Sequence, residues 1–213
     1  GNKCEKGSGK ETSADDALPN LQRYKREKLE VLMEDTGSGK LCIGLPLALG
    51  MYELAPLWHG IFRALGFSVR LSGFSSRALY AKGQYSIPSD TACYPAKIMH
   101  GHIETLLDAG VDAIFYPCLT YNVDEKAGEN HYNCPVVAYY SELLHSNMDR
   151  LKQKGFLYPY LDLNNPKHLA QGLRQSLNEG LGLSLTIRQT AHAVEQGIAA
   201  YEAWMADIRR AGE

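Results

Sequence analysis

From residue 41 onward, the apolar positions of the chain alternate between short continuous runs and longer stretches with helical spacing. Continuous runs bounded by glycine or proline predict buried strands, which we place at residues 41–46, 67–71, 113–116 and 136–140. Apolar residues at steps of three and four predict helices, which we place at about 51–65, 75–83, 94–109 and 141–154. Strands that alternate with helices favour a parallel sheet joined by right-handed crossovers.

Two more helices are predicted in the last quarter of the chain. Leu169, Leu173 and Leu177 step by four, and a second apolar seam runs from Ile187 to Ile208 in alternating steps of four and three. A seam of this kind is typical of core packing against a sheet, and the other interpretation is a docking surface for a further domain. We therefore expect a three-layer, Rossmann-like α/β domain over residues 41–213, with a mainly parallel sheet and C-terminal helices.

The first 40 residues differ from the rest because they are polar and contain few apolar positions. Residues 21–29 predict one short helix with a mostly solvated face. We interpret residues 1–40 as a partly helical linker or extension. The chain starts without methionine and carries Cys4 close to its first residue, so we expect it to be a fragment of a larger multidomain protein.

Composition excludes several classes of function. The 213 residues include 22 lysines and arginines against 24 acidic residues, for a formal charge of −2. No global basic field marks a nucleic-acid partner or an anionic membrane surface. The sequence has no apolar run of roughly 20 residues and no signal peptide at its start. We expect a cytoplasmic protein without a membrane or nucleic-acid partner.

Cysteines are the most informative candidates for chemistry. Five cysteines without an export signal favour reduced thiols in a metal site or in catalysis over disulfides. Cys93 comes just before a predicted helix, Cys118 directly follows a predicted strand, and Cys134 ends the loop that begins there. Active sites of parallel sheets lie in loops at the carboxyl ends of the strands. Cys42, inside the first strand, is interpreted as structural.

The residues themselves leave two kinds of chemistry open. Three thiolates suit zinc or an iron–sulfur cluster, with His131 or an external group as the remaining ligand. The gaps of 25 and 16 residues between the cysteines differ from the close pairs of structural zinc sites, so the fold would have to gather the ligands. Alternatively, a cysteine nucleophile is paired with a histidine base, for which His100, His102 and His131 are candidates. His100 and His102 are two residues apart on a predicted helix, so at most one can be that partner.

Several strings of the sequence occur together, in order, in one known family. They lie at residues 43–46, 51–53, 75–77, 87–97, 100–102, 115–118 and 130–135. Over about residues 41–145 the chain resembles the domain of unknown function in large bacterial activases specific for CoA-substrate enzymes. These proteins are related to the 2-hydroxyacyl-CoA (2-hydroxyglutaryl-CoA) dehydratase subunits. Residues 1–7 also resemble the cysteine-bearing segment that precedes this domain.

The resemblance implies a redox function. In the related dehydratases, cysteines on Rossmann-like domains hold a [4Fe–4S] cluster, and an ATP-driven activator injects one electron so that a 2-hydroxyacyl-CoA can lose water. Carried over to this sequence, the cluster ligands are Cys93, Cys118 and Cys134, with His131 as a further candidate. The implied partners are flanking actin-like ATPase activator domains and an acyl-CoA, and this fragment alone is not expected to hold a complete active site.

The residues and the resemblance together leave three functions open. The first is an iron–sulfur domain that accepts or relays electrons in an activase/dehydratase-type system. The second is a non-catalytic interaction domain, in which the cysteines are buried without metal and the last helix docks neighbouring domains. The third is a thiol-dependent hydrolase or transferase that acts on an acyl thioester.

The position of Cys134 conflicts with the cluster. If residues 136–140 form a parallel strand, Cys134 lies at the amino edge of the sheet and Cys118 at the carboxyl edge. A strand of five residues spans roughly 16 Å, which is too long for one cluster. Either this strand prediction is wrong, or Cys134 is structural.

Overall fold

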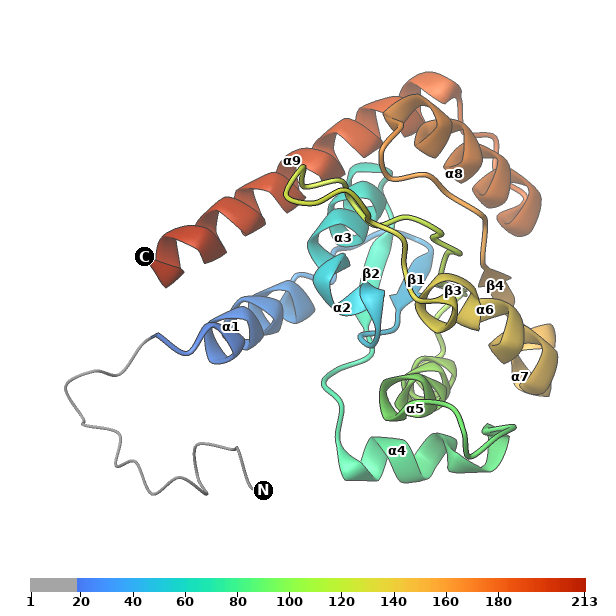
Figure 1. Ribbon diagram of the computed structural model, residues 1–213. Helices are drawn as coiled ribbons and strands as arrows, with labels where there is room; N and C mark the ends of the chain where they lie inside the picture. The colour runs from blue at the N-terminus through green and yellow to red at the C-terminus, as the bar shows by residue number, and fades with distance from the viewer. Residues whose placement is uncertain (1–18) are drawn as a thin grey trace, which may run out of the picture.

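The sheet has four parallel strands in the order β2-β1-β3-β4. The computed structural model describes residues 19–213, so Cys4 and the segment around it lie outside the described residues (Figure 1). The strands are β1 (Cys42–Leu45), β2 (Ser68–Leu71), β3 (Ala113–Phe115) and β4 (Gly155–Leu157). Ile43 pairs with Val69 on one side and with Ala113 on the other, so β1 is central. The predicted three-layer, Rossmann-like α/β fold is confirmed.

Helices cover both faces of the sheet. On one face lie α2 (Gly50–Glu53), α3 (Ala55–Ala64) and α8 (Pro166–Leu181), with α9 (Ile187–Gly212) across α3 and α8. On the other face lie α4 (Arg77–Gly83), α5 (Tyr94–Asp108), α6 (Pro135–Asn147) and α7 (Asp149–Lys152). Figure 1 shows these two groups of helices on opposite sides of the strands.

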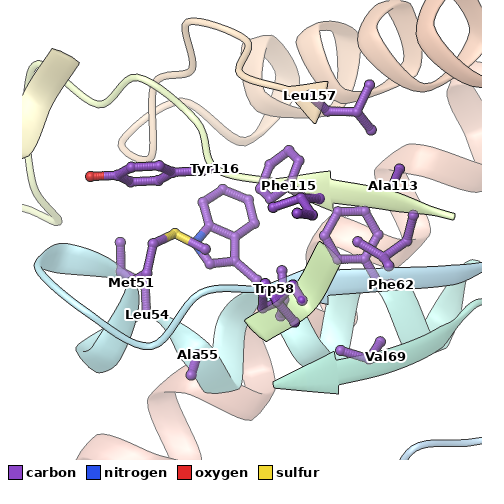
Figure 2. Packing of buried hydrophobic residues seen from close by; sticks show 14 of the residues in the cluster. Met51, Leu54, Ala55, Trp58, Phe62, Val69, Ala113, Phe115, Tyr116 and Leu157 are labelled. Atoms are coloured by element: carbon purple, nitrogen blue, oxygen red, sulfur yellow. The ribbon is translucent and has the colours of Figure 1, made fainter. Parts of the chain in front are cut away.

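Aromatic side chains from α3 and β3 form the centre of the core. The ring of Phe115 lies 4.9 Å from the rings of both Trp58 and Phe62, edge to face in each case (Figure 2). All three side chains are fully buried. Each such pair adds about 0.5–1.5 kcal/mol to the stabilisation from burial itself. This cluster holds α3 against the middle of the sheet. It also fixes the position of the loop that follows the carboxyl end of β3.

Two pairs of glycines let helices approach closely. A Cβ atom added at Gly60 of α3 would lie 3.1 Å from the Cα atom of Gly197 in α9. A Cβ atom added at Gly83 of α4 would lie 2.2 Å from the backbone nitrogen of Gly101 in α5. An added side chain would collide with the backbone of α5 at Gly83 and would press on that of α9 at Gly60. The glycines therefore let α4 lie close to α5 and α9 close to α3.

The extension before the sheet contains the predicted helix, α1 (Leu21–Glu34). It is tied to α9 through Asp207, which accepts a hydrogen bond from the Tyr24 hydroxyl at 2.8 Å and pairs with the Lys28 ammonium at 2.7 Å. These partners hold the pKa of Asp207 far below its usual range. The apolar seam of α9 contacts mainly α3, α8 and α1. Its interpretation as core packing is right, but it packs on the helical layer rather than directly on the sheet.

The strand predicted at residues 136–140 is wrong, because this segment is the first part of α6. Pro135 occupies the first helical position, where its missing N–H costs nothing. Ala138, Ser141 and Leu144 are buried along one helical face. The fourth strand of the sheet is instead β4. The sequence pattern predicted neither a strand nor a helix for its three residues. The predicted helix at 141–154 corresponds to the end of α6 and to α7.

Candidate functional site

The three candidate cysteines lie at the same edge of the sheet. Cys118 follows β3 and therefore lies at the carboxyl edge. Cys93 and Cys134 directly precede α5 and α6. A helix that connects two parallel strands runs back from the carboxyl edge, so its N-terminus lies there. The conflict over Cys134 disappears, because no strand separates it from Cys118.

Cys93 and Cys134 occupy equivalent positions at the starts of their helices. Each is the N-cap residue, each is exposed, and neither side chain accepts a hydrogen bond from the first helical turn. The free N–H groups and the helix dipole favour negative charge at both positions. Both are therefore suited to carry a thiolate or to bind a cation through one.

Cys118 has a different environment. Only 1% of the residue is exposed, and its Sγ lies 3.1 Å from the Ser141 hydroxyl oxygen. Burial raises the pKa of the Cys118 thiol. As placed, Cys118 is a neutral, buried and hydrogen-bonded thiol rather than a free ligand or nucleophile.

His131 lies on a hairpin-like segment of the loop between β3 and α6. Its carbonyl oxygen accepts the Asn122 N–H at 2.9 Å, and its ring centroid lies 5.4 Å from that of Tyr121. Two hydrogen bonds connect this segment to Asn164 in the loop before α8. His131 lines a hollow of about 360 Å³ together with neighbouring loop residues, and none of the described cysteines lines it.

The side chains at this edge are of the type that binds a metal cluster, but they are not arranged as a ligand group. The donor set is three cysteines at one edge, two of them at helix N-termini. Within residues 19–213, however, no three histidine, cysteine or acidic side chains form a group that could hold a metal ion. A hollow of about 720 Å³ lies between α8 and the start of α9, and none of the described cysteines lines it.

An unpartnered hydroxyl lies at the same edge. Tyr116 follows β3 directly and is 3% exposed, and its hydroxyl has no hydrogen-bond partner within the described residues. Figure 2 shows this hydroxyl pointing away from the aromatic cluster. Burial raises the pKa of Tyr116, so the group is a buried neutral donor. Orphaned buried donors of this kind are normally satisfied by water or a ligand.

The two histidines of α5 are fully buried, and burial lowers the pKa of each to about 4. The Ser86 hydroxyl donates to the Gly83 carbonyl at 3.0 Å and lies 2.8 Å from His100 Nδ1. Nδ1 must therefore be the donor in that pair, and His100 Nε2 accepts the Tyr140 hydroxyl at 3.0 Å. Burial, followed by the negative charge of a Cys93 thiolate, raises the pKa of Tyr140 to about 12.

His102 is the opposite tautomer of the neutral imidazole. The Ser72 hydroxyl accepts the Leu47 N–H at 2.8 Å and lies 2.7 Å from His102 Nδ1. Among the described residues Nδ1 is the only acceptor for the Ser72 proton. The proton of the neutral ring is then on Nε2, which donates to the Ser75 hydroxyl oxygen at 2.9 Å. The neutral ring of His100 therefore carries its proton on Nδ1, whereas that of His102 carries its proton on Nε2.

This arrangement argues against a cysteine–histidine pair. Both nitrogens of His100 and of His102 are occupied by hydroxyl groups. Among residues 19–213, no histidine nitrogen is hydrogen-bonded to a cysteine sulfur. The thiol-dependent hydrolase or transferase therefore has no support in the geometry. The hydroxyl partners Ser72, Ser86 and Tyr140 were not predicted, since nothing in their sequence spacing marks them.

The exposure of the cysteines predicts their reactivity. In the native protein, Cys93 and Cys134 are expected to react with iodoacetamide at least about ten-fold faster than Cys118, because only the first two thiols are accessible. Peptide mass spectrometry after timed labelling measures the three rates separately. In urea the rates should become similar. Fast labelling of Cys118 in the native state would contradict its buried placement.

Comparison with known proteins gives one match. A family model described as a CoA enzyme activase uncharacterised domain matches residues 42–213, which is the α/β body from β1 to the end of the chain. No curated protein and no solved structure matches the chain. No helix among the described residues has both the length and the apolar character needed to cross a membrane.

Proposed function

Because the chain belongs to the family of CoA enzyme activase uncharacterised domains, we propose that it serves an activase-type system as an iron–sulfur domain that accepts or relays electrons. The proposed cofactor is a [4Fe–4S] cluster at the carboxyl edge of the sheet. When bound, such a cluster takes up and passes on single electrons. The proposed partners are actin-like ATPase activator domains, and an acyl-CoA is the proposed substrate of the complete system.

One observation carries this proposal: two exposed cysteines, Cys93 and Cys134, occupy the N-cap positions of two helices that begin at one edge of the sheet. Backbone N–H groups at both helix starts would offset the negative charge of a thiolate-bound cluster. The unpartnered Tyr116 hydroxyl at this edge adds a buried donor without an acceptor.

The candidate ligands differ in how accessible their side chains are. Cys93 and Cys134 are the primary ligands, because their thiols are exposed. Cys118 is the third ligand only if it gives up its hydrogen bond to Ser141, and His131 is a further candidate on the adjoining loop. Since the described residues do not form a closed ligand group, the remaining ligands are proposed to come from a rearranged loop or from outside residues 19–213.

Iron binding tests the proposal directly. After anaerobic reconstitution, the wild-type chain is expected to hold about four irons and four sulfides. The double variant Cys93→Ser/Cys134→Ser is expected to hold less than about a quarter of that iron, because serine is a poor ligand for iron in such clusters. Iron and acid-labile sulfide are measured chemically, and the visible charge-transfer absorption is recorded in parallel.

Cys42→Ser is the matched control, since Cys42 lies within β1 and away from the carboxyl edge. It should retain the iron of the wild type. Equal iron in Cys42→Ser and in the double variant would refute the ligand assignment. An iron-free wild type would favour the non-catalytic interaction domain, although that alternative expects buried cysteines and two of the three are exposed.

A further inference from the structure

A hollow of about 390 Å³ lies between α1 and the loop that follows β2. Its wall is formed by polar and aromatic side chains: Asn20, Gln22, Arg23, Arg26, Tyr52, Phe74 and Ser75. Among the described residues, no cysteine and no acidic side chain lines it. Its size is within the range of about 300–1,000 Å³ that is usual for small-ligand sites.

A buried hydrogen-bond chain ends at this hollow. It starts at the Leu47 N–H, passes through the Ser72 hydroxyl and the His102 ring, and ends at the Ser75 hydroxyl oxygen. Every group in the chain donates toward the next one. Ser75 therefore receives the proton of His102 Nε2 and keeps its own proton for a group in the hollow. Aligned hydrogen bonds polarise one another, so the exposed end of this chain is a strengthened donor.

Two arginines and an aromatic ring complete the wall. The guanidinium carbon of Arg26 lies 4.1 Å from the centre of the Phe74 ring. Arg23 and Arg26 each use Nε to pair with a glutamate one turn further along α1. Within the described residues, their terminal NH₂ groups have no side-chain partner. A planar guanidinium with two free NH₂ groups matches the geometry of a phosphate. The aromatic side chains of Tyr52 and Phe74 add apolar surface to the same wall.

We propose that this hollow binds a nucleoside phosphate. The phosphate is held by the guanidinium groups of Arg23 and Arg26 and by the Ser75 hydroxyl, and the base lies against the apolar surface that Tyr52 and Phe74 give to the wall. Uncharged amides at Asn20 and Gln22 supply further hydrogen bonds. This site does not depend on the proposed cluster, because none of Cys93, Cys118 and Cys134 lines it and its ligand needs no metal.

Calorimetric titration of the metal-free chain tests the proposal, with adenosine monophosphate as the probe. Adenosine alone and inorganic phosphate alone serve as separate arms, and each is expected to bind at least about ten-fold more weakly than the nucleotide. Arg26→Gln is expected to weaken nucleotide binding about ten-fold or more, because a charged hydrogen-bonding group is lost. Ser75→Ala should weaken it about three-fold or more. Both residues are exposed, so the variants should fold.

Arg188→Gln is the control, since Arg188 is an exposed arginine on α9 that does not line this hollow. It should bind the nucleotide as the wild type does. Absence of nucleotide binding up to millimolar concentration would overturn the proposal, as would equal weakening by Arg26→Gln and Arg188→Gln. Inorganic phosphate that binds as tightly as the nucleotide would overturn the assignment of a nucleoside. None of these outcomes depends on whether the chain binds iron.

Discussion

Acidification from pH 7 to pH 4 is expected to destabilise the domain by about 3 kcal/mol for each of the two buried histidines. The pKa of His100 and of His102 in the folded chain is about 4, against an ordinary value of 6.5. Between these values the unfolded chain takes up protons that the folded chain does not. The full stability is therefore present above about pH 6.5 and is lost as the pH falls toward 4. Urea unfolding, followed by tryptophan fluorescence at several pH values, measures this slope.

Histidine variants separate this effect from general acid lability. His100→Gln is expected to lower the stability at pH 7 but to flatten its dependence on pH between 6.5 and 4.5. His192→Gln is the matched control, because His192 is exposed on α9 and should leave the slope unchanged. The same slope in His100→Gln and in the wild type would show that burial of this ring does not cause the pH dependence.

Gly101→Ala is expected to cost about 3 kcal/mol of stability. The added Cβ atom would lie 1.9 Å from the Leu79 carbonyl oxygen of α4. A helix backbone cannot move aside locally as a flexible side chain can, so α4 has to separate from α5. Urea unfolding measures the loss. The stacked pair of Tyr80 and Tyr94, whose ring centroids are 5.3 Å apart, should lose its near-ultraviolet circular dichroism signal at the same time.

Gly128→Ala is the matched control for this substitution. Gly128 lies in the loop before α6, and no other atom lies within 4 Å of an added Cβ atom there. The control should be within about 0.5 kcal/mol of the wild type, as is usual for surface substitutions. If Gly101→Ala were as stable as Gly128→Ala, the close crossing of α4 and α5 would be wrong.

The long periodic segments could be predicted from the sequence. The helix expected at 94–109 is α5 (Tyr94–Asp108), because an early proline and an apolar stripe agree there. The strand prediction at 136–140 was wrong for a specific reason. Its valines and tyrosines have high strand propensity, but Pro135 in front of it marks a helix start in the same way as Pro95 does for α5. β4 was missed because three residues at a sheet edge carry almost no periodic signal.

The candidate site was predictable only in part. The loop positions of Cys93 and Cys118 followed from the alternation of strands and helices. The exposure of Cys93 and the burial of Cys118 did not, because they depend on how α6 covers the end of β3. Likewise, the sequence showed that His100 and His102 cannot share one helix face. It could not show their hydroxyl partners, which come from three other segments of the chain.

The contacts that hold α1 against α9, here called the clasp, affect how the domain responds to mechanical force. An added Cβ atom at Gly212 would lie 3.3 Å from the Leu21 side chain, and Asp207 is bound to Tyr24 and Lys28. The two ends of the described chain therefore emerge side by side (Figure 1). Tension applied through both ends would peel α1 from α9 one contact at a time. The strands, which lie outside the line of force, would bear little of that load until the clasp had opened.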